Sequence, residues 1–133
     1  MEQIQRVLII DDDEISIYLT KRILKNMGIG TDVQTAQNGT EGLQKLKEAR
    51  EQEELPQLIL LDINMHGMDG LAFLEELGKL RYVNLIDTKI VLLSGTKIPL
   101  AIETAKKHMV ASFLQKPLTK DKLLSVLDWD MMF

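Results

Sequence analysis

Short runs of consecutive apolar residues alternate along this chain with segments that have the spacing of amphipathic helices. The clearest runs occupy residues 6–10, 58–61 and 89–93. Apolar residues at consecutive positions are typical of strands that are covered on both faces of a parallel sheet. Weaker runs at 31–36 and 112–115 predict flanking strands. Because parallel strands need crossover connections, the alternation predicts a doubly wound α/β fold of five strands and five helices.

The predicted helices lie between these runs. The first helix is predicted from an apolar stripe with a spacing of four residues, and Gly28 can end this helix. The stripe consists of Ile15, Leu19, Ile23 and Met27. Start signals for the four later helices also recur along the chain: Asn38-Gly39, Asp69-Gly70, Pro99 and Thr119.

Composition restricts the class of protein. A chain of 133 residues fits one domain, and 45% hydrophobic with 27% charged residues is typical of a globular protein. The net charge of -4 argues against a nucleic-acid surface, which needs clustered Lys and Arg. The chain has no cysteine for disulfides, thiolate catalysis or metal binding. No apolar run approaches the roughly 20 residues that span a bilayer, and no signal peptide is recognisable, so we expect a cytoplasmic protein.

Residues suited to phosphoryl chemistry stand at the ends of four predicted strands: Asp11, Asp62, Ser94 and Lys116. The carboxyl ends of parallel strands meet at one rim, where open α/β sheets bind their ligands. Asp12 and Asp13 add to the negative charge there, so the carboxylates would repel one another without a cation. Oxygen ligands favour a hard cation such as Mg²⁺, and a lysine with a hydroxyl beside it completes a site for a phosphoryl group.

Four motifs in this order, IIDDDEIS, LLDINMHGMDG, VLLSGT and FLQKPL, closely resemble the receiver domain of bacterial two-component response regulators, in its stand-alone, chemotaxis-regulator-like form. The resemblance covers residue 7 to about residue 127. It implies a flavodoxin-like sheet with strand order 2-1-3-4-5. It also implies that residues 1–133 form a single receiver domain, and we expect no output domain on this chain.

The resemblance implies a role for each residue of the acidic site. Asp62 would be the phosphoacceptor, and Mg²⁺ would be held by Asp11, Asp12 and Asp62 together with the backbone carbonyl of Asn64. Asp13 is expected to lie on the surface or to cap a helix, and we do not assign it to the metal.

The resemblance implies further roles around the phosphoryl group. Ser94 would donate a hydrogen bond to a phosphoryl oxygen, and Lys116 would pair with the phosphoryl charge. Pro117 would follow a cis peptide bond. Phe113 would take the place of the switch aromatic and, lacking a hydroxyl, would act through ring packing. Thr96 and Asn64 would flank the path of the hydrolytic water.

The implied function is transfer of a phosphoryl group to Asp62 from a histidine kinase, a histidine phosphotransfer protein or a small phosphodonor. The chain would catalyse only its own phosphorylation and dephosphorylation. A Mg²⁺-dependent switch would then signal to a protein target through the face of the fourth helix, fifth strand and fifth helix, with no DNA or membrane partner. The chain departs from the family at His66, where proline is usual, and at Met109-Val110, where Gly-Ala is usual.

Other interpretations of these motifs stay open. Asp11 and Asp12 could form an ordinary helix-capping turn. A phosphatase of the haloacid dehalogenase type would use Asp11 and Asp13, and a receiver that only binds partners would never accept phosphate. A flavodoxin-like FMN carrier shares the architecture but needs a phosphate loop that the sequence lacks. The apolar end WDMMF could pack back on the domain or support a weak homodimer, so we expect a monomer or a weak dimer.

Overall fold

A computed structural model describes residues 4–65, 70–80, 88–95 and 112–127. The strands are β1 (Arg6–Ile10), β2 (Asp32–Ala36), β3 (Leu58–Asp62), β4 (Lys89–Ser94) and β5 (Ser112–Gln115). The helices are α1 (Glu14–Met27), α2 (Gly39–Glu51), α3 (Gly70–Gly78) and α5 (Lys120–Val126). The fourth predicted helix, with Pro99, lies outside the described residues, as do Thr96, His66, Met109-Val110 and the WDMMF end.

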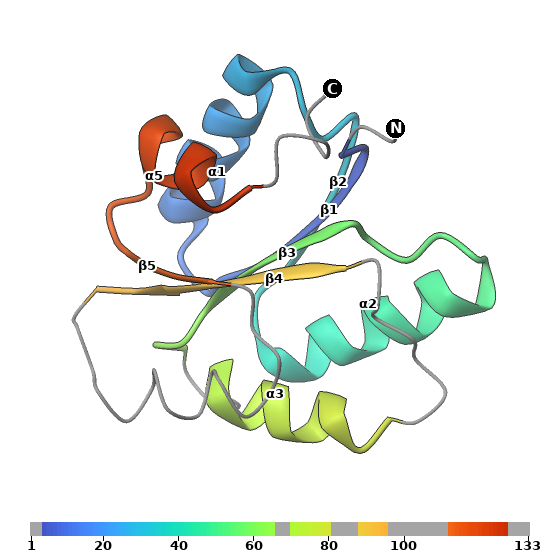
Figure 1. Ribbon diagram of the computed structural model, residues 1–133. Coiled ribbons are helices and arrows are strands. Elements are labelled where there is room, and N and C mark those ends of the chain that lie inside the picture. Colours follow the sequence, from blue (N-terminus) through green and yellow to red (C-terminus); the bar gives the residue numbers. More distant parts are fainter. Residues whose placement is uncertain (1–3, 66–69, 81–87, 96–111, 128–133) are drawn as a thin grey trace.

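All five strands pair in parallel in the order β2-β1-β3-β4-β5, which confirms the predicted sheet (Figure 1). In the register at the carboxyl edge, Ile10 lies opposite Leu61, Asp62 opposite Leu93, and Ser94 opposite Gln115. The strand order reverses between β1 and β3. The polar residues that follow β1 and end β3 therefore come together at this edge, where such sheets bind ligands.

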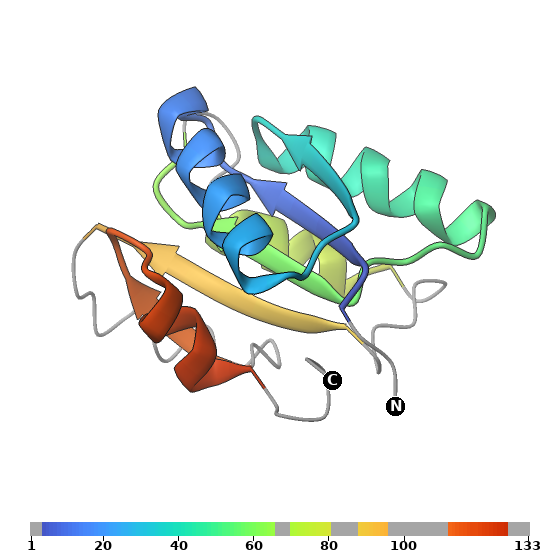
Figure 2. The same ribbon diagram turned by 90° about the horizontal axis from the view of Figure 1, so that it is seen from above.

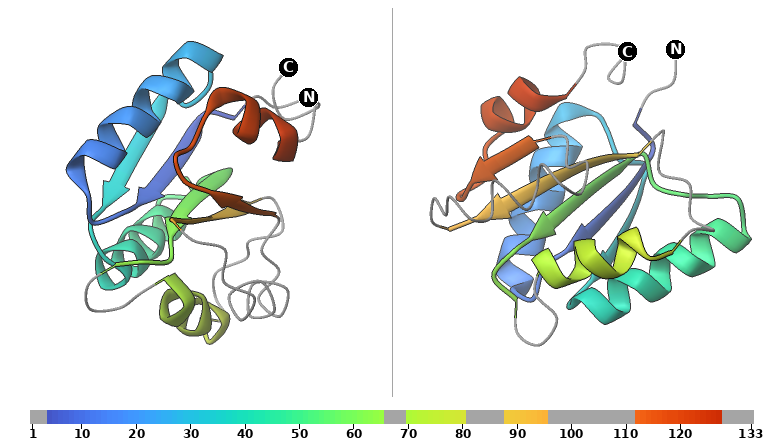
Figure 3. Two further views of the ribbon diagram at one scale, coloured as in Figure 1. Left: turned by 90° about the vertical axis from the view of Figure 1, so that its left-hand side faces the viewer. Right: turned by 60° about the horizontal axis from the view of Figure 1, so that its bottom comes forward.

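Two cores lie on opposite faces of the sheet because successive strand residues point in opposite directions. Helices α1 and α5 cover one face (Figure 2), where Ile9 packs in a cluster with Leu24 and Leu123. Helices α2 and α3 lie side by side over the other face (Figure 3), where Ile10 and Phe73 belong to the second cluster. The central strand β3 is buried at all five positions, as its continuous apolar run predicts.

The start signals Asn38 and Thr119 and the end signal Gly28 act as predicted, whereas Asp69 and Pro99 lie outside the described residues. Asn38 and Thr119 each occupy an N-cap position, with their side chains accepting hydrogen bonds from the backbone N–H groups of Glu41 and Lys122. Gly28 ends α1 with a φ of 72°, a left-handed conformation that glycine adopts without a steric cost. Among the described residues, no helix has both the length and the apolar character needed to cross a membrane.

The predicted apolar stripe of α1 is correct only in its second half. Ile23 and Met27 pack against the core, but Ile15 is 71% exposed and Leu19 50% exposed. A spacing of four residues drifts by about 40° per step around a helix of 3.6 residues per turn, so the four side chains cannot share one face. The sheet instead contacts the stripe that includes Ile17 and Leu24.

Candidate functional site

Three carboxylates meet where β1 and β3 end. Asp11 directly follows β1 and is 2% exposed, and Asp62 is the last residue of β3 and is 4% exposed. Asp12 is half-buried beside them. One oxygen from each of these side chains lies within 4.8 Å of the other two. The predicted acidic cluster therefore forms, and its two most buried members come from adjacent parallel strands.

Backbone groups in the loop after β1 fix the orientation of Asp11. Its backbone N–H donates to the carbonyl of Ala36 on β2 at 2.9 Å, and its Oδ1 accepts from the N–H of Asp13 at 2.9 Å. The side chain of Asp13 turns away and accepts from the N–H of Ile15 at 3.0 Å, which makes Asp13 the N-cap of α1. This confirms the capping prediction for Asp13 and leaves three acids, not four, at the site.

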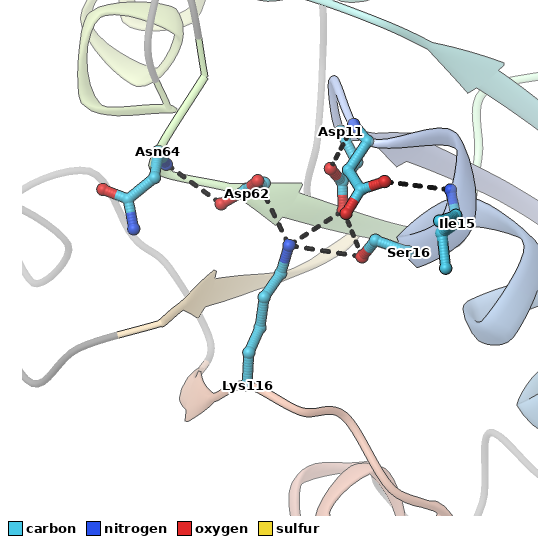
Figure 4. A network of polar contacts seen from close by, with 7 residues as sticks. Asp11, Ile15, Ser16, Asp62, Asn64 and Lys116 are labelled. Carbon is cyan, nitrogen blue, oxygen red and sulfur yellow. Dashed lines mark hydrogen bonds and ion pairs between the residues drawn. The ribbon is translucent and has the colours of Figure 1, made fainter.

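Lys116 reaches the acidic cluster from the end of β5. Its Nζ donates to Asp11 Oδ2 at 3.0 Å, to Asp62 Oδ2 at 3.2 Å and to Ser16 Oγ at 3.2 Å (Figure 4). Its backbone N–H donates to the carbonyl of Ser94 at 2.6 Å, which ties the base of the side chain to the end of β4. The peptide bond from Lys116 to Pro117 is cis, as predicted.

Ser16 belongs to this network, although sequence reasoning did not include it. Its Oγ lies 2.7 Å from Asp11 Oδ2 as well as 3.2 Å from the Lys116 ammonium. The sequence feature that points to Ser16 is its position in the first turn of the helix that follows the acidic loop. A side chain three residues after Asp13 lies on the same helix face, but nothing in the local sequence shows that Lys116 reaches it.

Burial and neighbouring charges change the acidity of both partners. Burial raises the pKa of Asp62 above its ordinary value, although the Asn64 N–H at 2.9 Å and the charge of Lys116 oppose this rise. Burial alone would lower the pKa of Lys116, but the hydrogen bond and charge of Asp11, followed by those of Asp62, raise it overall. The lysine is therefore firmly protonated, whereas Asp62 is a carboxylate held in an unfavourable environment.

Of the remaining predicted site residues, the structure describes Ser94, Asn64 and Phe113. Ser94 is fully buried at the end of β4, one position beyond Leu93, which pairs with Asp62. Asn64 is exposed in the loop after β3. Phe113 on β5 is half-buried and packs against the core on the α2 and α3 side. Thr96 lies outside the described residues.

Gly70 allows α3 to start close to the end of β3. A Cβ atom at this position would lie 2.8 Å from the backbone oxygen of Asp62 and 2.7 Å from the Cα of Ile63. Both contacts are shorter than real Cβ atoms tolerate, and backbone atoms cannot move aside cheaply. Glycine at the first position of α3 therefore lets the helix pack against the end of β3 without displacing Asp62.

The charge balance of the site indicates what it can bind. Three carboxylates and one ammonium leave an excess of two negative charges when all are ionised. Oxygen ligands without sulfur or imidazole suit a hard divalent cation such as Mg²⁺. Lys116 and the buried Ser94 add hydrogen-bond donors, so the residues fit a metal ion together with a phosphoryl group.

Comparison with known proteins gives a consistent result. The sequence matches the family described as Response regulator receiver domain over residues 7–128. It is 31% identical over 126 residues to a probable C4-dicarboxylate response regulator DctR of Halalkalibacterium halodurans, covering 95% of this chain and 51% of that protein. The chain thus spans about half the length of that relative. It is also 31% identical to the two-component response regulator ORR41 of Oryza sativa, covering 92% of this chain and 91% of that protein.

A solved structure agrees with these sequence matches. The two-component response regulator from Cytophaga hutchinsonii superposes with a TM-score of 0.86 at 27% identity, covering 94% of this chain and 95% of that one. The similarity therefore extends over nearly the whole of both folds.

Proposed function

We propose that this chain accepts a phosphoryl group on Asp62 in two-component signal transduction, because it belongs to the response regulator receiver domain family. The observation that carries this proposal is the position of the Lys116 ammonium, 3.0 Å from Asp11 and 3.2 Å from Asp62, beside three clustered carboxylates. Asp62 is the one of the three that ends the central strand. The donor would be the phosphohistidine of a sensor kinase or phosphotransfer protein, or a small phosphodonor.

The transfer step needs little from the protein beyond positioning and charge neutralisation. An Asp62 carboxylate oxygen attacks phosphorus, the P–N bond of the donor breaks, and its electron pair stays on the imidazole nitrogen, which is protonated. The product is an acyl phosphate. Lys116 and the Ser94 hydroxyl stabilise the phosphoryl oxygens. Asp11, Asp12, Asp62 and the carbonyl of Asn64 would hold Mg²⁺, which supplies charge neutralisation at the phosphoryl oxygens.

The same site would hydrolyse its own acyl phosphate slowly. Water attacks phosphorus, the bond between the Asp62 oxygen and phosphorus breaks, and the carboxylate and inorganic phosphate are released. Asn64 and Thr96 would flank the path of this water. We therefore propose that the chain catalyses its own phosphorylation and dephosphorylation and no other reaction.

The phosphorylated chain would pass its signal on by binding a target protein. Ser94 would move toward the phosphoryl group, and Phe113 would repack on β5, one residue after Ser112. The half-buried position of Phe113 against the core supports this role, since the residue contacts the core and is also partly exposed to solvent. The target surface would be β5, α5 and the predicted fourth helix. We place this process in the cytoplasm.

The exposed apolar side chains of α1 offer a docking surface for the phosphodonor. Ile15, Tyr18 and Leu19 are 71%, 60% and 50% exposed, and Ile15 and Leu19 line a cavity shared with Lys116. A donor protein must bring its phosphohistidine next to Asp62, and this patch lies beside the entrance to the site. We therefore assign the patch to the donor rather than to the downstream target.

The phosphatase alternative is not favoured by the geometry. It needs Asp11 and Asp13 as an acidic pair, whereas Asp13 caps α1 and its side chain is not part of the acidic cluster. It also gives no role to Asp62, which the central strand and Lys116 position directly at the cluster.

The decisive test is incubation with acetyl phosphate and Mg²⁺, read by intact-protein mass spectrometry. We expect one phosphoryl adduct that is labile to hydroxylamine and is lost in Asp62→Asn. Asp13→Asn is the matched control, because asparagine also caps helices and should keep the adduct. An adduct that is lost only in Asp11→Asn would favour the phosphatase. No adduct in the wild type, with beryllofluoride also failing to bind, would favour a receiver that only binds partners.

A further inference from the structure

The three N–H groups of the Lys116 ammonium have three acceptors around them. Two are carboxylate oxygens, Asp11 Oδ2 at 3.0 Å and Asp62 Oδ2 at 3.2 Å, and the third is the Ser16 hydroxyl at 3.2 Å. Lysine has no acceptor, so the ammonium must donate to Ser16 Oγ. The single hydroxyl proton of Ser16 is then free to donate to Asp11 Oδ2 at 2.7 Å. The direction of each hydrogen bond in this triangle is thereby fixed.

The three acceptors respond differently when the site is loaded. On the proposed function, on which this inference rests, Asp11 and Asp62 would share their negative charge with Mg²⁺ before the phosphoryl group arrives. Both carboxylates then attract Lys116 less, and a bound divalent cation repels the ammonium. Ser16 is neutral and ligates no metal in this arrangement, so its hydrogen bond to Lys116 keeps its strength.

The space around Lys116 allows its side chain to move away from the acidic cluster. A cavity of about 360 Å³ lies between α1 and the 116–118 segment and is lined by Ser16, Leu19, Lys116, Pro117 and other residues of these elements. The Lys116 side chain is 23% exposed, so solvent can compete for its ammonium. Ser16 lies in the first turn of α1, which Asp13 caps, so its hydroxyl is held by a helix rather than by a loop.

We propose that Ser16 is a positioning residue, whose hydroxyl holds the Lys116 ammonium over the phosphorylation site when a bound metal ion takes up the charge of the carboxylates. It acts through Lys116 and touches no reacting atom. Its loss removes one of the three hydrogen bonds of the Lys116 ammonium, so it should make this lysine more reactive and slow phosphorylation, while all the oxygen ligands that would hold Mg²⁺ stay in place.

The first experiment needs neither metal nor phosphodonor. Metal-free protein is treated briefly with acetic anhydride, and acetylation of each lysine is measured by peptide mass spectrometry. We expect Lys116 in Ser16→Ala to react roughly fivefold to tenfold faster than in the wild type, the scale expected for the net contribution of one typical hydrogen bond. Ser16→Thr should restore protection because it keeps the hydroxyl. Ser125→Ala, which removes an exposed serine hydroxyl on α5, is the matched control.

The second experiment measures phosphorylation from acetyl phosphate across a range of Mg²⁺ concentrations. Ser16→Ala should lower the maximal rate severalfold while the Mg²⁺ concentration for half-maximal rate stays as in the wild type, and Ser16→Thr should recover the rate. Unchanged Lys116 acetylation in Ser16→Ala, or an equal effect of Ser16→Thr, would overturn the inference. A wild type that takes no phosphoryl group would overturn the proposed function alone, since the acetylation result still decides whether Ser16 holds Lys116.

Discussion

At the scale of single residues, Asp62 is a carboxyl group in an environment that disfavours its charge. It is 4% exposed and lies near a second buried carboxyl, Asp11, while Lys116 and the Asn64 N–H offset only part of this cost. A phosphoacceptor needs a free carboxylate oxygen at the end of a rigid strand, and that requirement conflicts with the preference of charged groups for water. The raised pKa of Asp62 is the measurable sign of this conflict.

Asp62→Asn should stabilise the metal-free protein at neutral pH. Because the pKa of Asp62 is raised in the folded state, the fold is favoured while this carboxyl is protonated, and that stability, fully present below the ordinary pKa, is lost as the pH rises through the raised pKa. An amide does not titrate, and its oxygen can still accept a bond from Lys116. Urea unfolding in the presence of a chelator should therefore show a higher midpoint for Asp62→Asn at pH 7 to 8, and the difference should shrink toward acid pH.

The control for this effect is Asp121→Asn, an exposed acid in the first turn of α5. It should not reproduce the gain. A midpoint for Asp62→Asn that stays at or below the wild type across the whole pH range would mean that the ion pair with Lys116 outweighs the burial of the carboxylate.

At the scale of the elements, α1 has an apolar face that the fold leaves uncovered. If the phosphodonor docks on Ile15 and Leu19, then changing both to serine should slow transfer from a phosphorylated histidine phosphotransfer protein by about tenfold, as expected for loss of well-buried interface side chains. Transfer from phosphoramidate, a small donor with the same P–N bond, should be unchanged. Equal slowing with both donors would show that the patch supports the site itself and not docking.

A side chain of α5 forms hydrogen bonds with the backbone of the segment that carries Lys116. Lys122 Nζ donates to the carbonyl oxygens of Gln115 and Pro117, both at 2.9 Å, so it holds the backbone on either side of Lys116. A lysine in the first turn of a helix is unfavourable to the helix dipole. The two carbonyl contacts of Lys122 offset this cost.

Lys122→Met should lower the free energy of unfolding by about 1 kcal/mol, the net scale of one or two hydrogen bonds from a charged group that is partly exposed to solvent. It should also slow phosphorylation, because the backbone around Lys116 is no longer held. Lys122→Arg should recover part of both effects. Lys120→Met, an exposed lysine at the start of the same helix, serves as the control in urea unfolding and in the acetyl phosphate assay.

At the scale of the whole molecule, the acidic site should link metal binding to folding. An ion that binds only the folded state stabilises it by mass action, by about 1.4 kcal/mol at a free concentration ten times its dissociation constant. Mg²⁺ should therefore raise the urea midpoint of the wild type, and a chelator should reverse the rise. NaCl at matched ionic strength controls for general screening. The same gain in Asp11→Asn would argue against a metal site at the three carboxylates.

The sequence alone determined the strands, the helix starts and the location of the site. Residues 6–10 and 112–115 form strands as predicted, because continuous apolar runs and capping residues are local signals that the backbone obeys directly. The site at the carboxyl edge followed from topology, since parallel strands bring their ends together. The roles of the individual residues at this edge stay predictions from the family motifs.

Only the tertiary structure decided which side chains share a contact. Lys116 meets Asp11 across 105 residues of sequence and Ser16 across 100, and no local pattern encodes contacts at such separations. The wrong half of the α1 stripe has a further cause: a spacing of four residues drifts around the helix, and the sheet beneath α1 decides which part of the helix is buried. The contact of Ser16 with Lys116, the exposure of Ile15 and the hydrogen bonds of Lys122 therefore depend on the packed fold. Only there are helix and strand positions fixed relative to one another.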